Sequence, residues 1–127
     1  MRYMMMHKID ENLPGAFNPS PEFMARMESF MKEAGQSGIL LAAEGLCKTS
    51  KADATRITVT GGKTTVTDGP FTETKELIAG FALVDVRSHE EAVEWGRRFS
   101  DVFAETIGEV EVDIRRVYEG PEHGQSA

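Results

Sequence analysis

The chain has 127 residues, of which 40% are hydrophobic and 28% are charged, and its formal net charge is −7. This length suits one domain with one hydrophobic core. The acidic balance argues against a nucleic-acid partner, because phosphate binding needs a basic surface. No stretch reaches the roughly 20 apolar residues that a spanning helix requires, so we expect no membrane partner.

The N-terminal segment predicts a strand followed by a loop. Residues 2–8 (RYMMMHK) form the strand, with Tyr3, Met5 and His7 on one face because side chains alternate. Apolar residues on both faces indicate burial on both sides. Residues 10–19 are rich in Asp, Asn, Pro and Gly, which predicts a loop.

A helix follows this loop. Ser20 is a favourable N-cap, the next residue is a proline that fits the first helical position, and Gly35 marks the end. The helix carries an apolar stripe, which we interpret as core packing rather than a cofactor site. The stripe consists of Phe23, Met27, Phe30, Met31 and Ala34.

The central part of the chain predicts four strands. Residues 39–46 form one strand, and the polar segment 47–55 connects it to the next. Residues 56–60 and 64–68 alternate β-branched and polar side chains on either side of a glycine pair, which is typical of a hairpin. Residues 79–86 form the fourth strand of this region.

The C-terminal part predicts a helix, a last strand and a tail. Ser88 and Glu91 have the spacing of a capping box at a helix start. Residues 109–117 alternate as the last strand. We expect a single domain over residues 1–118, followed by a polar tail at 119–127.

The element order predicts an α+β fold of the ferredoxin-like kind. Two helices would cover one face of an antiparallel sheet, and the hairpin would be an addition to that plan. The second face would then be open, and its apolar surface favours a homodimer that covers it. We expect this open face to carry Tyr3, Met5, Leu41, Ala82 and Val84.

Three segments carry a resemblance to a known family. The segments TVTDGPFTETKE, GFALVDV and EEAVEWGRRF resemble those of the YCII-related proteins, in the branch named for its Asp-Gly-Pro-Phe (DGPF) signature. The likeness covers roughly residues 1–118 and implies a dimeric α/β barrel. Some relatives in the wider group are linked to ring cleavage or dehalogenation through histidine–aspartate pairs. Genes of this branch often lie beside extracytoplasmic-function sigma factors, which implies a regulatory context.

Three side chains are candidates for acid–base catalysis. Asp68 follows a strand, and Glu44 and His7 lie near the ends of two others. If these groups converge at the mouth of a polar cleft, they suit proton abstraction beside a carbonyl. The alternative is a structural corner, in which Asp68 caps a turn, Gly69 allows a close approach and the following proline ends the strand pairing.

Three further side chains are candidates for substrate binding. Arg115 would hold a substrate carboxylate, although its neighbour Arg116 is an alternative. Phe71 would form an apolar plug, and Lys75 would belong to a charged lid over the cleft. Alternatively, Glu44 and Arg115 pair with each other across the sheet.

We expect neither a cofactor nor a metal. The three histidines (His7, His89 and His123) and the only cysteine, Cys47, lack the paired spacing of a metal site. A Gly-rich phosphate loop and a serine-nucleophile elbow are both missing from the sequence. A single cysteine excludes an intramolecular disulfide, which favours a cytoplasmic location.

The sequence therefore favours a small homodimer that binds an anionic or aromatic molecule in a polar cleft. Two functions remain open. One is a cofactor-independent lyase or isomerase that uses acid–base catalysis. The other is a non-enzymatic ligand-sensing or interaction module associated with sigma-factor-type transcription regulation.

Overall fold

The structure, a computed structural model, describes residues 1–50 and 53–120. The elements follow in the predicted order, and their ends agree with the predicted ones to within about two residues. Of the predicted tail, residues 121–127 lie outside the described part. The elements are β1 (Arg2–Lys8), α1 (Pro21–Gln36), β2 (Leu40–Gly45), β3 (Thr55–Thr60), β4 (Lys63–Asp68), the 3₁₀ helix η1 (Thr74–Glu76), β5 (Ile78–Asp85), α2 (His89–Thr106) and β6 (Glu111–Arg116).

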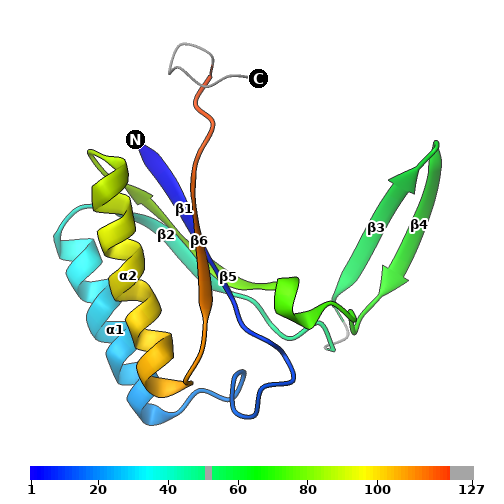
Figure 1. Ribbon diagram of the computed structural model, residues 1–127, viewed down its shortest axis with the longest axis horizontal. Helices are drawn as coiled ribbons and strands as arrows, with labels where there is room; N and C mark the ends of the chain where they lie inside the picture. Colours follow the sequence, from blue (N-terminus) through cyan, green and yellow to red (C-terminus); the bar gives the residue numbers. More distant parts are fainter. Residues whose placement is uncertain (51–52, 121–127) are drawn as a thin grey trace.

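The main sheet is antiparallel and has the strand order β2-β5-β1-β6. Both helices lie on the same face of this sheet and run beside each other (Figure 1). The arrangement confirms the predicted α+β class and is consistent with a ferredoxin-like fold. Within the described residues the sheet stays open, with β2 and β6 as its edges, and no barrel closes.

Both helices begin at the predicted caps. The hydroxyl of Ser20 accepts a hydrogen bond from the Phe23 amide at 3.1 Å, and that of Ser88 accepts one from the Glu91 amide at 3.1 Å. These bonds satisfy amides that the first turn of a helix leaves without partners. Among the described residues, no helix combines the length and the apolarity that crossing a bilayer requires.

The alternation along β1 decides which side chains form the core. Tyr3 and Met5 are buried on the helix-covered face, where they pair with Val84 and Ala82 of β5. The expectation that these four residues lie on the open face is therefore wrong, and only Leu41 of the expected set is exposed. The reason is that a one-residue shift in assignment exchanges the two faces of a strand, and one sequence does not reveal that choice.

The open face, which lies opposite the helices, has its own apolar centre. Met4 is opposite Leu83 and Met6 is opposite Phe81, and all four side chains are half-buried. On a covered sheet such pairs would be fully buried. The open face of a single chain thus presents a contiguous apolar surface to solvent.

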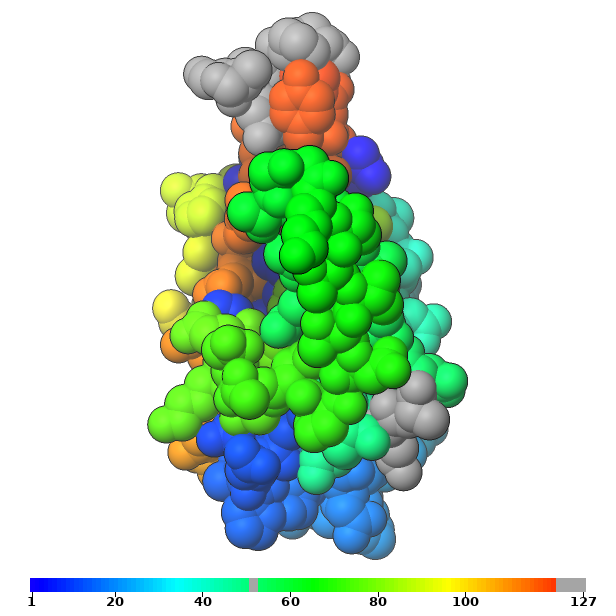
Figure 2. Space-filling model, turned by 90° about the vertical axis from the view of Figure 1, so that its right-hand side faces the viewer, coloured from blue at the N-terminus to red at the C-terminus, as the bar shows by residue number. Residues whose placement is uncertain are grey.

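Strands β3 and β4 form a separate two-stranded sheet, which we call the arm (Thr55–Asp68). Its turn contains Gly61 and Gly62 at positive φ (57° and 79°), as the predicted hairpin requires. The arm projects from the body on the side away from the helices (Figure 1). Figure 2 shows it, in green, running down that side of the molecule. Every residue of both strands is exposed.

The Asp-Gly-Pro-Phe corner fastens the base of the arm to the body. The amide of Gly69 donates to the Ala54 carbonyl at 2.9 Å, and the amide of Phe71 donates to the Thr49 hydroxyl at 3.1 Å. Thr49 in turn donates to the buried carboxylate of Glu11 through its amide and its hydroxyl, both at 2.7 Å. These contacts support a structural role for the corner.

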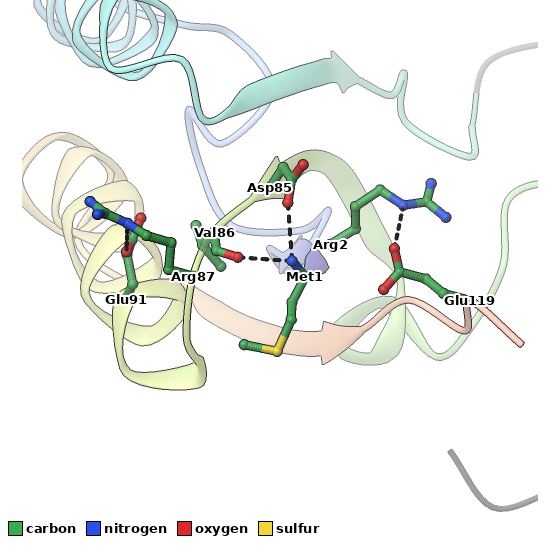
Figure 3. Close-up of polar contacts among 7 residues, drawn as sticks. All are labelled: Met1, Arg2, Asp85, Val86, Arg87, Glu91 and Glu119. Atoms are coloured by element: carbon green, nitrogen blue, oxygen red, sulfur yellow. Dashed lines mark hydrogen bonds and ion pairs between the residues drawn. The ribbon is translucent and has the colours of Figure 1, made fainter. Parts of the chain in front are cut away.

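Polar contacts also tie the start of β1 to neighbouring segments (Figure 3). The amino group of Met1 donates to the Asp85 carboxylate at 3.1 Å and to the Val86 carbonyl at 2.9 Å. The Arg2 guanidinium donates to Glu119 at 3.1 Å. Exposed ion pairs of this kind add at most about 1 kcal/mol each, so the buried face of the sheet contributes far more to stability.

Gly69→Ala is expected to destabilise the protein. A β-carbon at this position would lie 1.8 Å from the Thr49 carbonyl oxygen, so the corner would have to move off the segment that holds it. We expect a loss of about 1–3 kcal/mol in the free energy of unfolding, measured by urea denaturation. Gly35→Ala in α1, where nothing lies within 4 Å of the added carbon, is the matched control and should not lower stability. Full stability of Gly69→Ala would contradict the close packing of the corner.

Candidate functional site

A cavity of about 460 Å³ lies between the helices and the sheet. Its volume is within the range of small-molecule sites, roughly 300–1,000 Å³. Aromatic and aliphatic side chains dominate the lining, so this cavity differs in character from the polar cleft that was expected. The lining residues are His7, Phe23, Met27, Met31, Leu40, Ala43, Glu44, Gly45, Phe81, Phe99 and Phe103.

The helices supply the apolar wall by their periodicity. Phe23, Met27 and Met31 recur every four residues on α1, and Phe99 and Phe103 have the same spacing on α2. Residues four apart share one face of a helix. The α1 stripe was predicted to pack in the core, and Phe30 does so. The other three large side chains of that stripe are half-buried because they border the cavity.

His7 is the polar group of this wall. Its imidazole stacks on Phe103 with a centroid distance of 4.5 Å and meets the edge of Phe99 at 5.5 Å. The residue is only 8% exposed, and among the described residues its Nδ1 atom has no hydrogen-bond partner. A buried polar atom without a partner is costly. The imidazole thus has spare hydrogen-bonding capacity beside an apolar cavity.

Burial lowers the pKa of His7 from 6.5 to about 4. The cause is desolvation, since an apolar environment disfavours the charged imidazolium. The ring is therefore neutral at pH 7. A neutral imidazole offers one nitrogen as a donor and the other as an acceptor, so it can bind an uncharged polar group.

Gly80 makes room for this imidazole on the sheet. Gly80 of β5 lies opposite His7 in β1 and opposite Gly45 in β2. A β-carbon on Gly80 would lie 2.5 Å from Cε1 of His7 and 2.6 Å from the Glu44 carbonyl oxygen. The histidine ring therefore packs over bare backbone at this point, which keeps it beneath the helices.

The structure does not bring Glu44 to His7 as an acid–base partner. Glu44 borders the cavity but is exposed, and it pairs with Phe81, one position away from the Gly45–Gly80 pair that lies beside His7. Since neighbouring residues of a strand point to opposite faces, the Glu44 side chain belongs to the open face.

Arg115 also lies on the open face, opposite Met4, and it is exposed. Its neighbour Arg116 lies opposite Tyr3 and is exposed as well. The alternative that Arg115 pairs with Glu44 across the sheet is wrong, because β6 and β2 are the two opposite edges. None of these charged groups lies beside the imidazole.

The remaining predicted residues surround the arm. Asp68 ends β4 and accepts a hydrogen bond from the Thr55 hydroxyl at 3.2 Å. The Phe71 ring lies 4.1 Å below the guanidinium of Arg56. Lys75 borders a separate, smaller cavity of about 220 Å³. The six predicted site residues therefore do not converge, and only His7 and Glu44 border the apolar cavity.

The described residues contain no group of three or more His, Cys, Asp or Glu side chains that could hold a metal ion. Cys47 is exposed, and so is His89 at the start of α2. His123 lies outside the described residues. The cavity and His7 therefore make up the candidate site.

Comparisons with known proteins give matches over most of the chain. The family model described as the YCII-related domain matches residues 1–114. "Uncharacterized protein R00369" of Rhizobium meliloti (strain 1021) is 31% identical over 120 residues, which cover 93% of this chain and 94% of that protein. Its name assigns no activity.

His7→Phe is expected to change how stability depends on pH. In the wild type the free energy of unfolding should fall as the pH is lowered from 6.5 to about 4. In this range His7 is protonated in the unfolded chain but not in the folded protein. The shift corresponds to a loss of at most about 3 kcal/mol. Phenylalanine keeps the ring packing and removes the proton site, so the variant should lose this dependence.

The measurement is urea denaturation of wild type and variant at pH 7 and pH 4.5. His89→Phe, at an exposed position, is the matched control and should retain the wild-type slope. If the free energy of unfolding falls equally between pH 7 and pH 4.5 in His7→Phe and in the wild type, the fold does not hold His7 neutral.

Proposed function

The chain belongs to the YCII-related domain family, and we propose that it is a binding protein for a small, uncharged aromatic molecule. The single observation that carries this proposal is the buried imidazole of His7, whose Nδ1 has no hydrogen-bond partner among the described residues, beside a cavity with an aromatic wall. A ligand with one hydroxyl or amino group would satisfy the imidazole while its ring packs among Phe99, Phe103 and the methionines of α1.

The charge of the lining favours an uncharged ligand over an anionic one. Among the described residues neither Lys nor Arg borders the cavity, so no cationic side chain is available there to pair with an anion. A neutral His7 adds no positive charge. Transfer of an unpaired charge into such an environment is unfavourable. Of the two kinds of ligand expected from the sequence, an aromatic molecule therefore fits this cavity better than an anionic one.

The same geometry favours binding over catalysis. A cofactor-independent lyase or isomerase would need a second titratable side chain within reach of the proton that it moves. Asp68 lies at the arm, and the Glu44 side chain belongs to the other face of the sheet. A ligand-sensing role fits the regulatory context that the family resemblance implies, since binding alone suffices for sensing.

We further propose that the protein is a cytoplasmic homodimer of one domain, 1–118, in the DGPF branch of the family. The open face supports the dimer, because pairing two copies would remove Met4, Met6, Phe81 and Leu83 from water. The exposed thiol of Cys47 fits a reducing compartment. The corner that begins at Asp68 fits the branch signature.

Thermal-shift measurements with toluene, phenol, indole and benzoate test the ligand class. Phenol and indole should raise the melting temperature most, because they combine a ring with a hydrogen-bonding group. Benzoate should raise it least because of its charge. In the wild type, phenol should bind about fivefold more tightly than toluene, which corresponds to one net hydrogen bond of about 1 kcal/mol. His7→Phe should remove this difference. Stronger stabilisation by benzoate than by phenol would contradict the proposal.

Met27→Trp is expected to block the cavity. Met27 borders the cavity, and the larger side chain would occupy the space of the ligand. The variant should lose the phenol-induced shift while remaining folded by circular dichroism. Met24→Trp, on the same helix but 57% exposed, is the matched control and should keep the shift. An unchanged shift in Met27→Trp would place phenol binding elsewhere.

A further inference from the structure

The cavity beside His7 has a buried end and an exposed end. His7, Phe99 and Phe103 are buried and form the inner end. Glu44 and Gly45, the last two residues of β2, are exposed and form the outer end. Because exposed residues border the cavity at this end, the cavity opens to solvent there. A ligand held at the imidazole can therefore extend toward the end of β2.

Three paired positions of the sheet connect these two ends on the helix-covered face. His7 of β1 lies opposite Gly80 of β5, and Gly80 lies opposite Gly45 of β2. Residues that lie opposite each other in paired strands direct their side chains to the same face. The imidazole occupies the space above Gly80, because a β-carbon there would lie 2.5 Å from its Cε1 atom. The space above Gly45 is therefore the next one along this row, beside the imidazole.

The space above Gly45 is empty. An added β-carbon at this position would have no described atom within 4 Å. The backbone does not require a glycine either, because the φ angle of Gly45 is not positive. A strand position with free space above it would favour a larger, β-branched residue for stability. The missing side chain therefore leaves room in the cavity and does not serve the packing of the sheet.

The cavity is larger than one aromatic ring requires. Its volume is about 460 Å³, whereas a protein cavity of roughly 150 Å³ is enough to bind benzene. A single ring beside His7 would leave much of the apolar lining in contact with water. A second ring would cover more of this lining, and the burial of apolar surface would strengthen binding.

We propose that Gly45 is the specificity-determining residue of the cavity, and that the ligand is an uncharged aromatic molecule of two rings. One ring carries the polar group that binds the imidazole of His7. The other ring lies above Gly45, in the space that a side chain at this position would take. This inference rests on the binding function proposed above, and it adds the size of the ligand and the residue that sets it.

Calorimetric titration with phenol and naphthol tests this proposal. Both compounds carry one hydroxyl group and are uncharged at pH 7, and they differ by one fused ring. The wild type should bind naphthol about tenfold more tightly than phenol, because the second ring buries more apolar surface. Gly45→Val should remove this difference, since valine fills the space above residue 45 and leaves the inner end unchanged. Phenol affinity should therefore stay within about threefold of the wild-type value.

Ala42→Val is the matched control. Ala42 belongs to the same strand, is exposed and does not border the cavity. It pairs with Leu83 of the open face, so the added carbons lie on the other side of the sheet. This variant should bind phenol and naphthol with the affinities of the wild type.

Stability distinguishes a role in specificity from a role in the fold. Gly45→Val should keep or raise the free energy of unfolding in urea, because its β-carbon meets no described atom and valine is favoured in strands. Gly45→Ala adds the β-carbon alone and is the second variant, in case the valine variant does not fold. It should weaken naphthol binding about threefold, which corresponds to the space of one carbon, and should not lower stability.

The outcomes separate this inference from the proposed function. If the wild type binds phenol through His7 but binds naphthol no more tightly, the inference is overturned and the proposed function stands. The same holds if the variants at Gly45 keep the preference for naphthol, lose both ligands equally or are less stable than the wild type. If the wild type binds neither compound, both the inference and the proposed function are overturned.

Discussion

The strict alternation of β1 is the constraint on which the rest of the structure depends. Met5, at 1% exposure, anchors one face of this strand beneath the helices, and the period of two then places His7 on the same face. The same rule sends Met4 and Met6 to the open face. One strand therefore places the imidazole on the buried face and two methionines on the open face of the sheet.

The sequence predicts the local structure well because the signals are local. The caps at Ser20 and Ser88 and the glycine pair of the hairpin act within a few residues, and each is found where it was expected. Local signals do not decide which face of a strand is buried, because that choice depends on pairing with distant segments. The assignment of Tyr3 and Met5 to the open face failed for this reason.

The candidate site was predicted only in part. His7 was identified, but its partners were sought among charged residues, whereas the structure surrounds it with Phe99, Phe103 and the methionines of α1. The signal that could have found them is the position of His7 on the same face as Met5. Asp68 was predicted as a catalytic residue because it begins the Asp-Gly-Pro-Phe corner. In the structure, the amides of Gly69 and Phe71 in this corner form hydrogen bonds at the base of the arm.

The two faces of the sheet are connected through β2. Gly45 borders the cavity, and the next residue, Leu46, donates to the Ala79 carbonyl at 2.8 Å before the chain leaves for the arm. A ligand beside His7 would therefore contact the strand end from which the arm connection departs.

The central claim is that the fold holds His7 neutral on the helix-covered face, and an NMR titration of its imidazole in the wild-type protein tests it most directly. The account predicts that the ring stays uncharged down to a midpoint at about 4. A midpoint at 6.5, the ordinary value, would show an imidazole open to water and would contradict the account.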